Sequence, residues 1–202
     1  MLAAALREHA PPPGAAALDV CTGSGLLAVQ AALLGARVTA VDVMRRALLS
    51  ARANARLNGV RVRTCQGSLF DGLDGERFDT IVSNPPYVPA PLEELPARGP
   101  RRAWDAGRDG RALLGPLCEQ VADHLRPGGT VLIVHSSVSG VQRTLDDLTA
   151  GGLDADIVVR RRGPLGPLLR ERAEDLWATG ALEPGSLEEE IVIVRGRRLA
   201  PT

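Results

Sequence analysis

The stretch Asp19-Val20-Cys21-Thr22-Gly23-Ser24-Gly25 joins a short apolar segment to a helical pattern. Residues 15–20 have the composition of a buried strand, and residues 26–34 that of a helix ending at a glycine. The small residues between them let the backbone approach a ligand closely, and the start of the helix presents free N–H groups. The sequence therefore predicts a strand, a ligand-binding turn and a helix, the unit from which nucleotide-binding α/β folds are built.

The rest of the chain alternates between apolar strands and helices in the same way. Further strands are predicted at 37–42, 60–66, 78–83, 130–135, 155–160 and 190–195, and further helices at 44–58, 111–125, 141–150 and 168–179. Strands separated by helices indicate right-handed crossovers and a parallel sheet. The last two strands lack a full crossover pattern, which predicts an antiparallel pairing. We expect an α/β fold with a Rossmann-like, doubly wound, mostly parallel seven-stranded sheet and a C-terminal antiparallel strand.

The length of 202 residues suits a single domain. Three segments stand outside the alternation: an N-terminal arm at 1–14, a loop rich in Pro, Gly and Arg at 88–109, and a charged insertion at 161–187 before the last strand. Loops as long as 88–109 are usually functional in compact domains, so we expect this one to border an active site. Arginines gather at 160–162 and 195–198, but interleaved acidic residues favour a solvated, salt-bridged face over a nucleic-acid surface.

The composition argues against several classes of protein. The 24 basic residues, all arginine, balance 24 acidic ones, so the overall charge gives no indication of nucleic-acid binding. The three cysteines are widely spaced without a CxxC pattern, which indicates neither a zinc site nor a disulfide framework and fits a reducing cytoplasm. No segment approaches the roughly 18 apolar residues of a membrane span. We expect a cytoplasmic protein that does not use a metal.

Two carboxylates indicate what the glycine turn binds. Asp42 ends the second predicted strand, at the place where a carboxylate commonly binds ribose hydroxyls. NAD enzymes and S-adenosylmethionine enzymes share this layout, so the pattern by itself indicates a nucleoside cofactor. The third glycine of the nicotinamide fingerprint is Ala28 here, which is a tolerated change. Asp19 would repel a pyrophosphate but suits the amino group of a methionine-type cofactor.

The tetrapeptide Asn84-Pro85-Pro86-Tyr87 directly follows the predicted strand at 78–83. Its two prolines fix the backbone and remove two donors, and a residue before proline is kept out of the helical region. The result is a stiff platform with one amide side chain and one aromatic ring. The amide oxygen of Asn84 and the carbonyl of Pro85 can accept hydrogen bonds from a planar NH2 group, while Tyr87 offers a flat face. The alternative interpretation is an ordinary proline-rich turn.

With Asp19–Gly25, Asp42 and Asn84–Tyr87 in this order, the chain resembles the class I S-adenosylmethionine-dependent methyltransferases. Among them it is most similar to the HemK-like family, which methylates the glutamine amide of translation release factors. The resemblance runs from about residue 15 to 150, and residues 103–111 are most similar to the eukaryotic and archaeal-type branch. It implies S-adenosyl-L-methionine as cofactor, a protein substrate and, as in some eukaryotic relatives, a small activating subunit.

Carried over residue by residue, the resemblance implies a cofactor site and a substrate site. The cofactor site would contain Asp19, Cys21, Thr22, Gly23, Gly25, Asp42, Val43, Ser68, Leu69 and Asn84. The catalytic residues would be Asn84, Pro85, Pro86 and Tyr87, which hold the substrate NH2 group and shape its slot. Catalysis would then rest on orientation and charge complementarity for an in-line displacement at a sulfonium methyl, with no metal and no covalent enzyme intermediate.

Three features depart from the family pattern. Cys21 stands where the first glycine of the turn is usual, and Ser68 stands where an acidic residue contacting adenine is expected. The N-terminal substrate-positioning region of many relatives is expected to be absent or very short. Two alternatives remain open: a methyltransferase acting on an exocyclic adenine or guanine amine in DNA or RNA, and a non-catalytic S-adenosylmethionine-binding protein. The first is less favoured because the chain shows no added target-recognition region.

Overall fold

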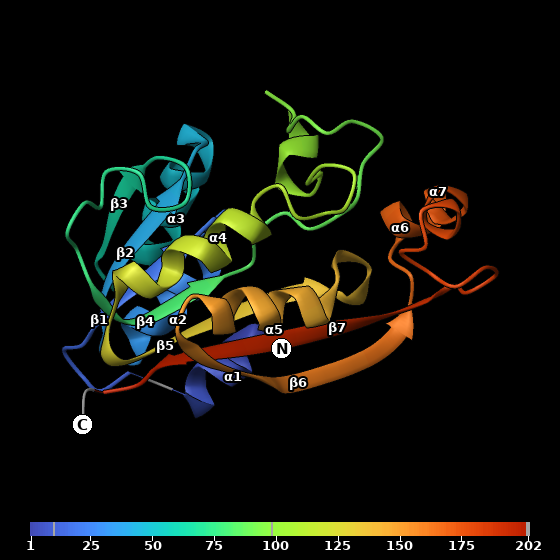
Figure 1. Cartoon of the computed structure of the whole chain (residues 1–202). Helices are drawn as coiled ribbons and strands as arrows, with labels where there is room; N and C mark the ends of the chain where they lie inside the picture. The colour runs from blue at the N-terminus through green and yellow to red at the C-terminus, as the bar shows by residue number, and fades with distance from the viewer. Residues whose placement is uncertain (10, 98, 201–202) are drawn as a thin grey trace.

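The computed structural model describes residues 1–9, 11–97 and 99–200. A seven-stranded sheet with the order β3-β2-β1-β4-β5-β7-β6 forms its centre (Figure 1). The strands are β1 Ala16–Val20, β2 Arg37–Asp42, β3 Val62–Gln66, β4 Phe78–Ser83, β5 Leu125–Ser136, β6 Leu153–Pro164 and β7 Glu188–Arg198. Strands β1 to β5 pair in parallel, and β7 runs antiparallel to both of its neighbours. The predicted fold is confirmed.

Helices cover both faces of the sheet. They are α1 Leu2–Glu8, α2 Leu26–Leu33, α3 Arg45–Leu57, α4 Leu114–Gln120, α5 Val141–Ala150, α6 Pro167–Glu171 and α7 Ala173–Ala178, with 3-10 turns η1 Pro100–Ala103, η2 Val121–His124 and η3 Ser137–Ser139. Helices α1 and α2 pack on one face, and α4 and α5 on the other. The sheet is therefore doubly wound, which leaves the carboxyl ends of its strands free to form a site.

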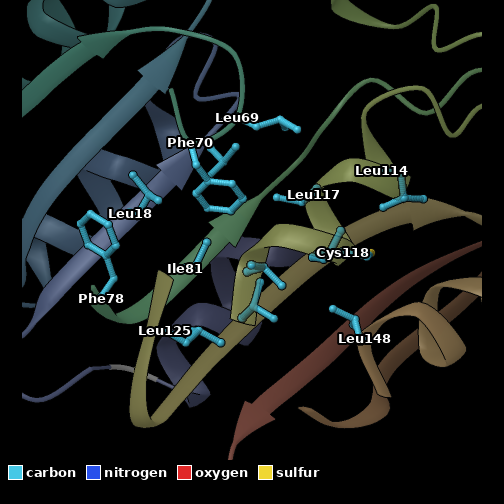
Figure 2. Close-up of a cluster of buried hydrophobic side chains, with 14 of the residues drawn as sticks. Leu18, Leu69, Phe70, Phe78, Ile81, Leu114, Leu117, Cys118, Leu125 and Leu148 are labelled. Carbon is cyan, nitrogen blue, oxygen red and sulfur yellow. The ribbon is translucent and has the colours of Figure 1, made fainter. Parts of the chain in front are cut away.

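Alternating side chains explain why both faces of the sheet are apolar. Leu18 and Ile81 belong to the cluster under α4 and α5, whereas their neighbours Ala17 and Val82 belong to the cluster under α1 and α2. Successive side chains of a strand point to opposite faces, so a strand covered on both sides must be apolar throughout. Figure 2 shows the first of these clusters, in which a phenylalanine, Phe70, lies among the aliphatic side chains.

The region around the start of β5 differs from the prediction. The predicted helix at 111–125 is the shorter α4 followed by η2, and β5 begins at Leu125 rather than at residue 130. The strand therefore contains Pro127-Gly128-Gly129, which predicted a turn. A Cβ at Gly129 would lie 3.1 and 3.2 Å from the carbonyl oxygens of Phe78 and Asp79. Glycine lets the two backbones approach here, so β5 stays beside β4 where the pattern predicted a break.

Strands β6 and β7 form a longer hairpin than predicted, which reduces the insertion at 161–187 to residues 165–187. Arginine and carboxylate side chains pair across it, as Arg160–Glu190, Arg162–Glu188, Arg195–Asp156 and Arg197–Asp154. Opposite charges facing each other across a ladder stabilise the pairing. These pairs lengthen the hairpin and provide the salt-bridged face that the interleaved charges predicted.

The two remaining differences concern helices. Residues 1–14, predicted as an arm, contain α1, whose buried side chains are Leu2, Ala5 and Leu6. This spacing of i, i+3 and i+4 puts one apolar stripe against the sheet. The predicted helix at 168–179 is two short helices, α6 and α7, which meet at Arg172. Across the described residues, every helix is too short or too polar to cross a membrane.

Candidate active site

A pocket of about 310 Å³ opens at the carboxyl ends of β1, β2, β3 and β4. Nine residues of the predicted site line it: Cys21, Thr22, Gly23, Asp42, Val43, Ser68, Leu69, Asn84 and Pro86. Lining residues that the sequence did not predict are Ser24, Leu26, Leu27, Val41, Met44, Gly67, Leu95, Arg102, Ala103 and Leu113. The volume falls within the range of small-molecule sites, about 300 to 1,000 Å³. The fold thus brings the glycine turn and the tetrapeptide to one cavity.

Asp19 lies beneath the glycine turn and does not line the pocket. Its Oδ2 accepts hydrogen bonds from the Thr22 hydroxyl at 2.6 Å and from the Ala28 amide at 3.0 Å. Its Oδ1 is buried without a partner among the described residues. Burial raises the pKa of Asp19 to about 7; the two hydrogen bonds oppose this rise, and the nearby charge of Asp42 adds to it. Asp19 shapes the turn, and its contact with a cofactor stays a prediction.

Cys21 adopts the left-handed backbone conformation, with φ of 59°. A residue with a Cβ is strained there by about 1 to 2 kcal/mol, which is the physical reason why glycine suits this position. Burial raises the pKa of its thiol to about 12, and the charges of Asp42 and Asp19 contribute to the rise. The thiol therefore stays protonated and is inert as a nucleophile.

Gly25 supports the turn from the helix side and does not line the pocket. It precedes α2 with φ of 80°, and a Cβ there would lie 2.7 Å from Cα of Ala51. Only glycine allows this approach of α2 to α3, so Gly25 positions the start of α2 beside the pocket.

The carboxylate of Asp42 connects the end of β2 to the glycine turn. Its Oδ2 accepts from the Gly23 amide at 3.0 Å, and its Oδ1 accepts from the Met44 amide at 2.8 Å. A carboxylate has about four acceptor sites, so each oxygen keeps a lone pair for a ligand hydroxyl. Asp42 therefore holds the turn and remains able to bind a ligand in the pocket.

The turn after β3 forms another wall of the pocket. The Ser68 amide donates to Oδ2 of Asp71 at 3.0 Å, and within the described chain the Ser68 hydroxyl has no hydrogen-bond partner. Leu69 is held in the left-handed region, with φ of 49°. A carboxylate is thus present three residues after Ser68, but Asp71 holds the turn and does not line the pocket.

The tetrapeptide leaves the sheet at the end of β4, beside the pocket. The hydroxyl of Ser83, the last residue of β4, donates to the Val20 carbonyl at 2.8 Å and so connects the two strands from which the turn and the tetrapeptide emerge. Asn84 is exposed. Among the described residues, nothing donates a hydrogen bond to its side-chain oxygen or to the Pro85 carbonyl. Both acceptors therefore lack a partner among the described residues, and Asn84 also lines the pocket.

Pro86 lines the pocket, whereas Pro85 and Tyr87 do not. The Tyr87 ring packs against a separate apolar cluster that includes Trp104 and buried leucines of α6 and α7. Burial raises the pKa of Tyr87, and the charge of Glu189 adds to this rise. Tyr87 therefore anchors the tetrapeptide to this cluster and not to the pocket. Its contact with a substrate stays a prediction.

The loop at 88–109 folds beside the tetrapeptide and contributes Leu95, Arg102 and Ala103 to the pocket. Its two ends are joined, because the Val88 amide donates to the Trp104 carbonyl at 2.8 Å. The loop therefore borders the pocket through these residues. In Figure 1 its described residues lie beyond the carboxyl end of β4.

Arg172, at the junction of α6 and α7, fastens this loop to the segment at 165–187. Its guanidinium donates to the Asp105 carboxylate at 2.7 Å and also to the Pro89 carbonyl. The side chains of Arg172 and Asp105 are 16% and 6% exposed, so the ion pair is largely removed from water. The residues between β6 and β7 thus support the loop that borders the pocket.

Arg111 binds residues of η3 and α5 close to the tetrapeptide, and its role was not predicted from the sequence. It is 4% exposed. Its Nη1 donates to the Ser139 carbonyl at 2.7 Å and to the Thr144 hydroxyl at 2.9 Å, and its Nη2 to the Asp147 carboxylate at 2.7 Å. The Ser139 hydroxyl donates to the Tyr87 carbonyl at 2.7 Å, which connects this network to the tetrapeptide. In the sequence, the indication of its importance was that Arg111 belongs to the stretch 103–111, which takes part in the family resemblance.

The pocket offers free acceptors and apolar walls, and its one thiol is protonated. No group of three or more His, Cys, Asp or Glu side chains is placed to hold a metal ion in the part of the chain that the structure describes. The cavity can bind one small molecule between the glycine turn and the ends of β2 and β3. Asn84 lines the same cavity and has a side-chain oxygen without a partner among the described residues. Such a site suits a reaction that depends on bringing two reactants together.

Comparison with known proteins agrees with this description. The family model of the methyltransferase small domain matches residues 1–94. A Methanocaldococcus jannaschii protein named as a candidate protein N5-glutamine methyltransferase is 33% identical over 153 residues, which cover 75% of this chain and 77% of the relative. A release factor glutamine methyltransferase of Geobacter sulfurreducens is 41% identical over 129 residues, which cover 60% of this chain and 45% of the relative. The chain spans less than half of the first release-factor enzymes it matches.

Solved structures share the fold. The E. cuniculi Mtq2-Trm112 complex, described as responsible for methylation of the eRF1 translation termination factor, is similar with a TM-score of 0.66. The match covers 98% of this chain and 92% of that chain at 20% identity. At this identity the likeness shows the arrangement of strands and helices alone.

Proposed function

Because the chain belongs to the protein N5-glutamine methyltransferase family, we propose that it transfers a methyl group from S-adenosyl-L-methionine to the side-chain amide nitrogen of a protein glutamine. The observation that carries this proposal is the pair of free acceptors beside the pocket, the Asn84 side-chain oxygen and the Pro85 carbonyl. A glutamine NH2 group presents two N–H donors in one plane, and two acceptors on a rigid tetrapeptide match that demand.

The residues of the pocket fit the cofactor. Thr22 and Gly23, in the turn before α2, would contact its methionine part, and the first amides of α2, at Leu26 and Leu27, would favour its carboxylate. Asp42 would bind the ribose hydroxyls, and the side chains of Val43 and Leu69 would contact the adenine ring. When bound, S-adenosyl-L-methionine supplies an electrophilic methyl group on a positively charged sulfur.

The chain's own residues would act by orientation and electrostatics. An amide nitrogen is a poor nucleophile because its lone pair is delocalised onto the carbonyl. Asn84 and Pro85 would hold both N–H groups and so fix the direction of the nitrogen lone pair, and their oxygens would stabilise the positive charge that develops on that nitrogen. The methylated nitrogen then loses one proton to water. Pro86 and Leu95, which line the pocket, would restrict the access of other water molecules.

We infer that the substrate is a translation release factor. Curated relatives are named release factor glutamine methyltransferases, and the E. cuniculi neighbour is described as acting on eRF1. Because that neighbour is a complex with Trm112, we also propose a small activating subunit for this chain. Three free thiols support a location in the reducing cytoplasm. The exocyclic amine of adenine or guanine has the same planar NH2 geometry and is therefore the competitor to test.

The test uses methyl-labelled cofactor, with and without an activating subunit, and three kinds of acceptor. These are a release factor, its variant with alanine for glutamine in the GGQ loop, and RNA and DNA oligonucleotides. We expect label on the release factor alone, and only when the glutamine is present. Label on the oligonucleotides would assign the chain to nucleobase methylation. Failure of the protein to bind S-adenosylhomocysteine in calorimetry would exclude both enzymatic functions.

Asn84→Ala tests the role of the free acceptor. We expect kcat/KM to fall by about 10² to 10³, the effect of removing one preorganised hydrogen-bonding group from an active site. The melting temperature should not change, because the Asn84 side chain is exposed and makes no hydrogen bond to the described residues. Asn58→Ala, at the exposed end of α3, is the matched control and should keep full activity. Wild-type activity of Asn84→Ala would disprove the proposed role.

A further inference from the structure

A broad groove of about 760 Å³ is lined by residues at the opposite end of the sheet, where β1, β2 and β4 begin. These strands are labelled in Figure 1. Five arginines line it: Arg37, Arg61, Arg63, Arg77 and Arg126. One acidic residue, Glu76, is also in the lining. The chain as a whole has a formal net charge of zero, so this gathering of positive charge is a local feature that the composition does not show.

Acidic residues neutralise only part of this charge. Arg63 pairs with Glu76, and Arg126 pairs with Asp79 at 2.7 Å. The four side chains are between 31% and 54% exposed, so both pairs lie in water. Exposed ion pairs contribute about 0 to 1 kcal/mol, and their arginines can therefore exchange a carboxylate for another anion at little cost.

The other three arginines have no acidic partner among the described residues. Nε of Arg37 donates to the neutral Gly14 carbonyl at 3.0 Å. Arg61 and Arg77 are exposed and form neither a hydrogen bond nor an ion pair with any residue that the structure describes. With five guanidinium groups against two carboxylates, the groove keeps an excess of positive charge and several unused donors.

We propose that this groove binds the sugar–phosphate backbone of a nucleic acid without reading its bases. The planar fork of arginine matches phosphate oxygens in pairs, and an open groove with several such forks suits a chain of repeated phosphates. Its floor is made of small or buried side chains such as Ala16, Ala36 and Phe78, and Phe78 is 3% exposed. No aromatic ring in the described lining is available to stack a base, so phosphate contacts would supply the affinity.

This surface is separate from the cofactor pocket and does not depend on the proposed function. The groove lies where the strands begin, and the pocket lies where they end. The five residues of β1 between them span about 15 Å at the usual rise per residue. Nucleic acid in the groove would therefore leave the pocket open.

The test is fluorescence anisotropy with labelled RNA and DNA strands of about 12 nucleotides, a length suited to single-strand sites. A polyglutamate peptide of equal charge serves as the third probe. We expect the wild-type protein to bind both nucleic acids with a Kd on the order of 10⁻⁵ M at about 50 mM salt, in the non-specific range. Preference for one nucleic acid would identify the natural source of the backbone.

Arg61→Gln/Arg77→Gln removes the two unpaired arginines. We expect the affinity to fall by at least about tenfold and the slope of log K against log salt to decrease in magnitude by about 1.4, since each phosphate contact to a single strand contributes about 0.7. Arg161→Gln/Arg170→Gln is the matched control, because it removes the same charge from exposed arginines of β6 and α6. The control should change the affinity less than about twofold.

Three results would overturn the proposal. The first is no binding of either nucleic acid by the wild-type protein, and the second is an equal loss in both double variants. The third is tighter binding of polyglutamate, which would assign the groove to an acidic protein. Melting temperature and calorimetry with S-adenosylhomocysteine show that the variants are folded. These measurements, like the anisotropy, do not require methyl transfer, so failure of the proposed enzymatic function would be recognised separately.

Discussion

Replacing Arg111 by methionine is expected to destabilise the fold and to disturb the tetrapeptide. The guanidinium is buried and donates to the carbonyls of Ser139 and Gly140, to Thr144 and to Asp147. Methionine keeps the length and apolar stem of the side chain but supplies no donor. The Ser139 carbonyl, the Thr144 hydroxyl and the Asp147 carboxylate therefore lose this donor at once, and the Gly140 carbonyl keeps the donors of Thr144.

The magnitude follows from the exposure of the groups left behind. Removing one partner of a buried ion pair costs about 3 to 5 kcal/mol. Asp147 is 29% exposed and can be hydrated after the change, which favours the lower end, about 3 kcal/mol. For a domain of this size about 1 kcal/mol shifts the melting temperature by about 2 to 4 °C, so Arg111→Met should melt about 6 to 12 °C lower.

Differential scanning calorimetry checks this value, and Arg143→Met provides the comparison. Arg143 pairs with Asp109 at 3.1 Å, but the two side chains are 63% and 52% exposed. That pair should contribute about 0 to 1 kcal/mol because water screens it. The activity of Arg111→Met at a temperature where it is folded should also fall, since Ser139 holds the Tyr87 carbonyl. A loss of melting temperature no larger than that of Arg143→Met would refute the reasoning.

Two further predictions rest on buried titratable groups. Because the pKa of Asp19 is raised to about 7 from its ordinary value of 3.8, the folded protein binds a proton that the unfolded chain has lost. Stability should therefore fall as the pH rises from about 4 to about 7. Between about pH 5 and pH 8 the free energy of unfolding of the wild-type protein should decrease by about 2 to 3 kcal/mol, a decrease that Asp19→Asn should not show. Urea denaturation at both pH values measures this difference. Parallel curves for the two proteins would contradict the buried carboxyl. Cys118, which is buried and whose pKa is raised to about 12, should resist iodoacetamide at about pH 8 while the half-exposed Cys65 is alkylated. Mass spectrometry of tryptic peptides that shows Cys118 alkylated as fast as Cys65 would contradict this prediction.

The strands, and the residues that meet at their carboxyl ends, could be predicted from the sequence because both depend on local patterns. Apolar runs such as 78–83 are strands wherever both faces are covered, and glycines such as Gly23 and Gly25 form the turn through their own backbone freedom. The carboxyl ends of parallel strands meet at one edge, so the turn at Asp19–Gly25 and the tetrapeptide were expected to lie together. The pocket confirms that they share a cavity.

The remaining features depend on contacts between distant segments, which no local pattern encodes. The direction of the Tyr87 ring is set by the cluster with α6 and α7, and the role of Arg111 is set by residues 28 to 36 positions away. The predicted start of β5 was wrong because a glycine such as Gly129, read from the sequence alone, indicates a turn. In the structure Gly129 instead allows the backbone of β5 to approach β4 closely. The length of the β6–β7 hairpin depends on cross-strand charge pairs, which are visible only once the register is known.

Strand β7 lies between β5 and β6 in the sheet, although it follows both of them in the chain. During synthesis, β5 and β6 therefore emerge from the ribosome with their inner edges unpaired, and each waits for a strand that has not yet been made. Unpaired strand edges are templates for pairing with other chains. A nascent chain that stops before Glu188 would keep both edges exposed and would aggregate rather than yield a smaller stable domain. The sheet is thus completed only when β7 has been made and pairs with both strands.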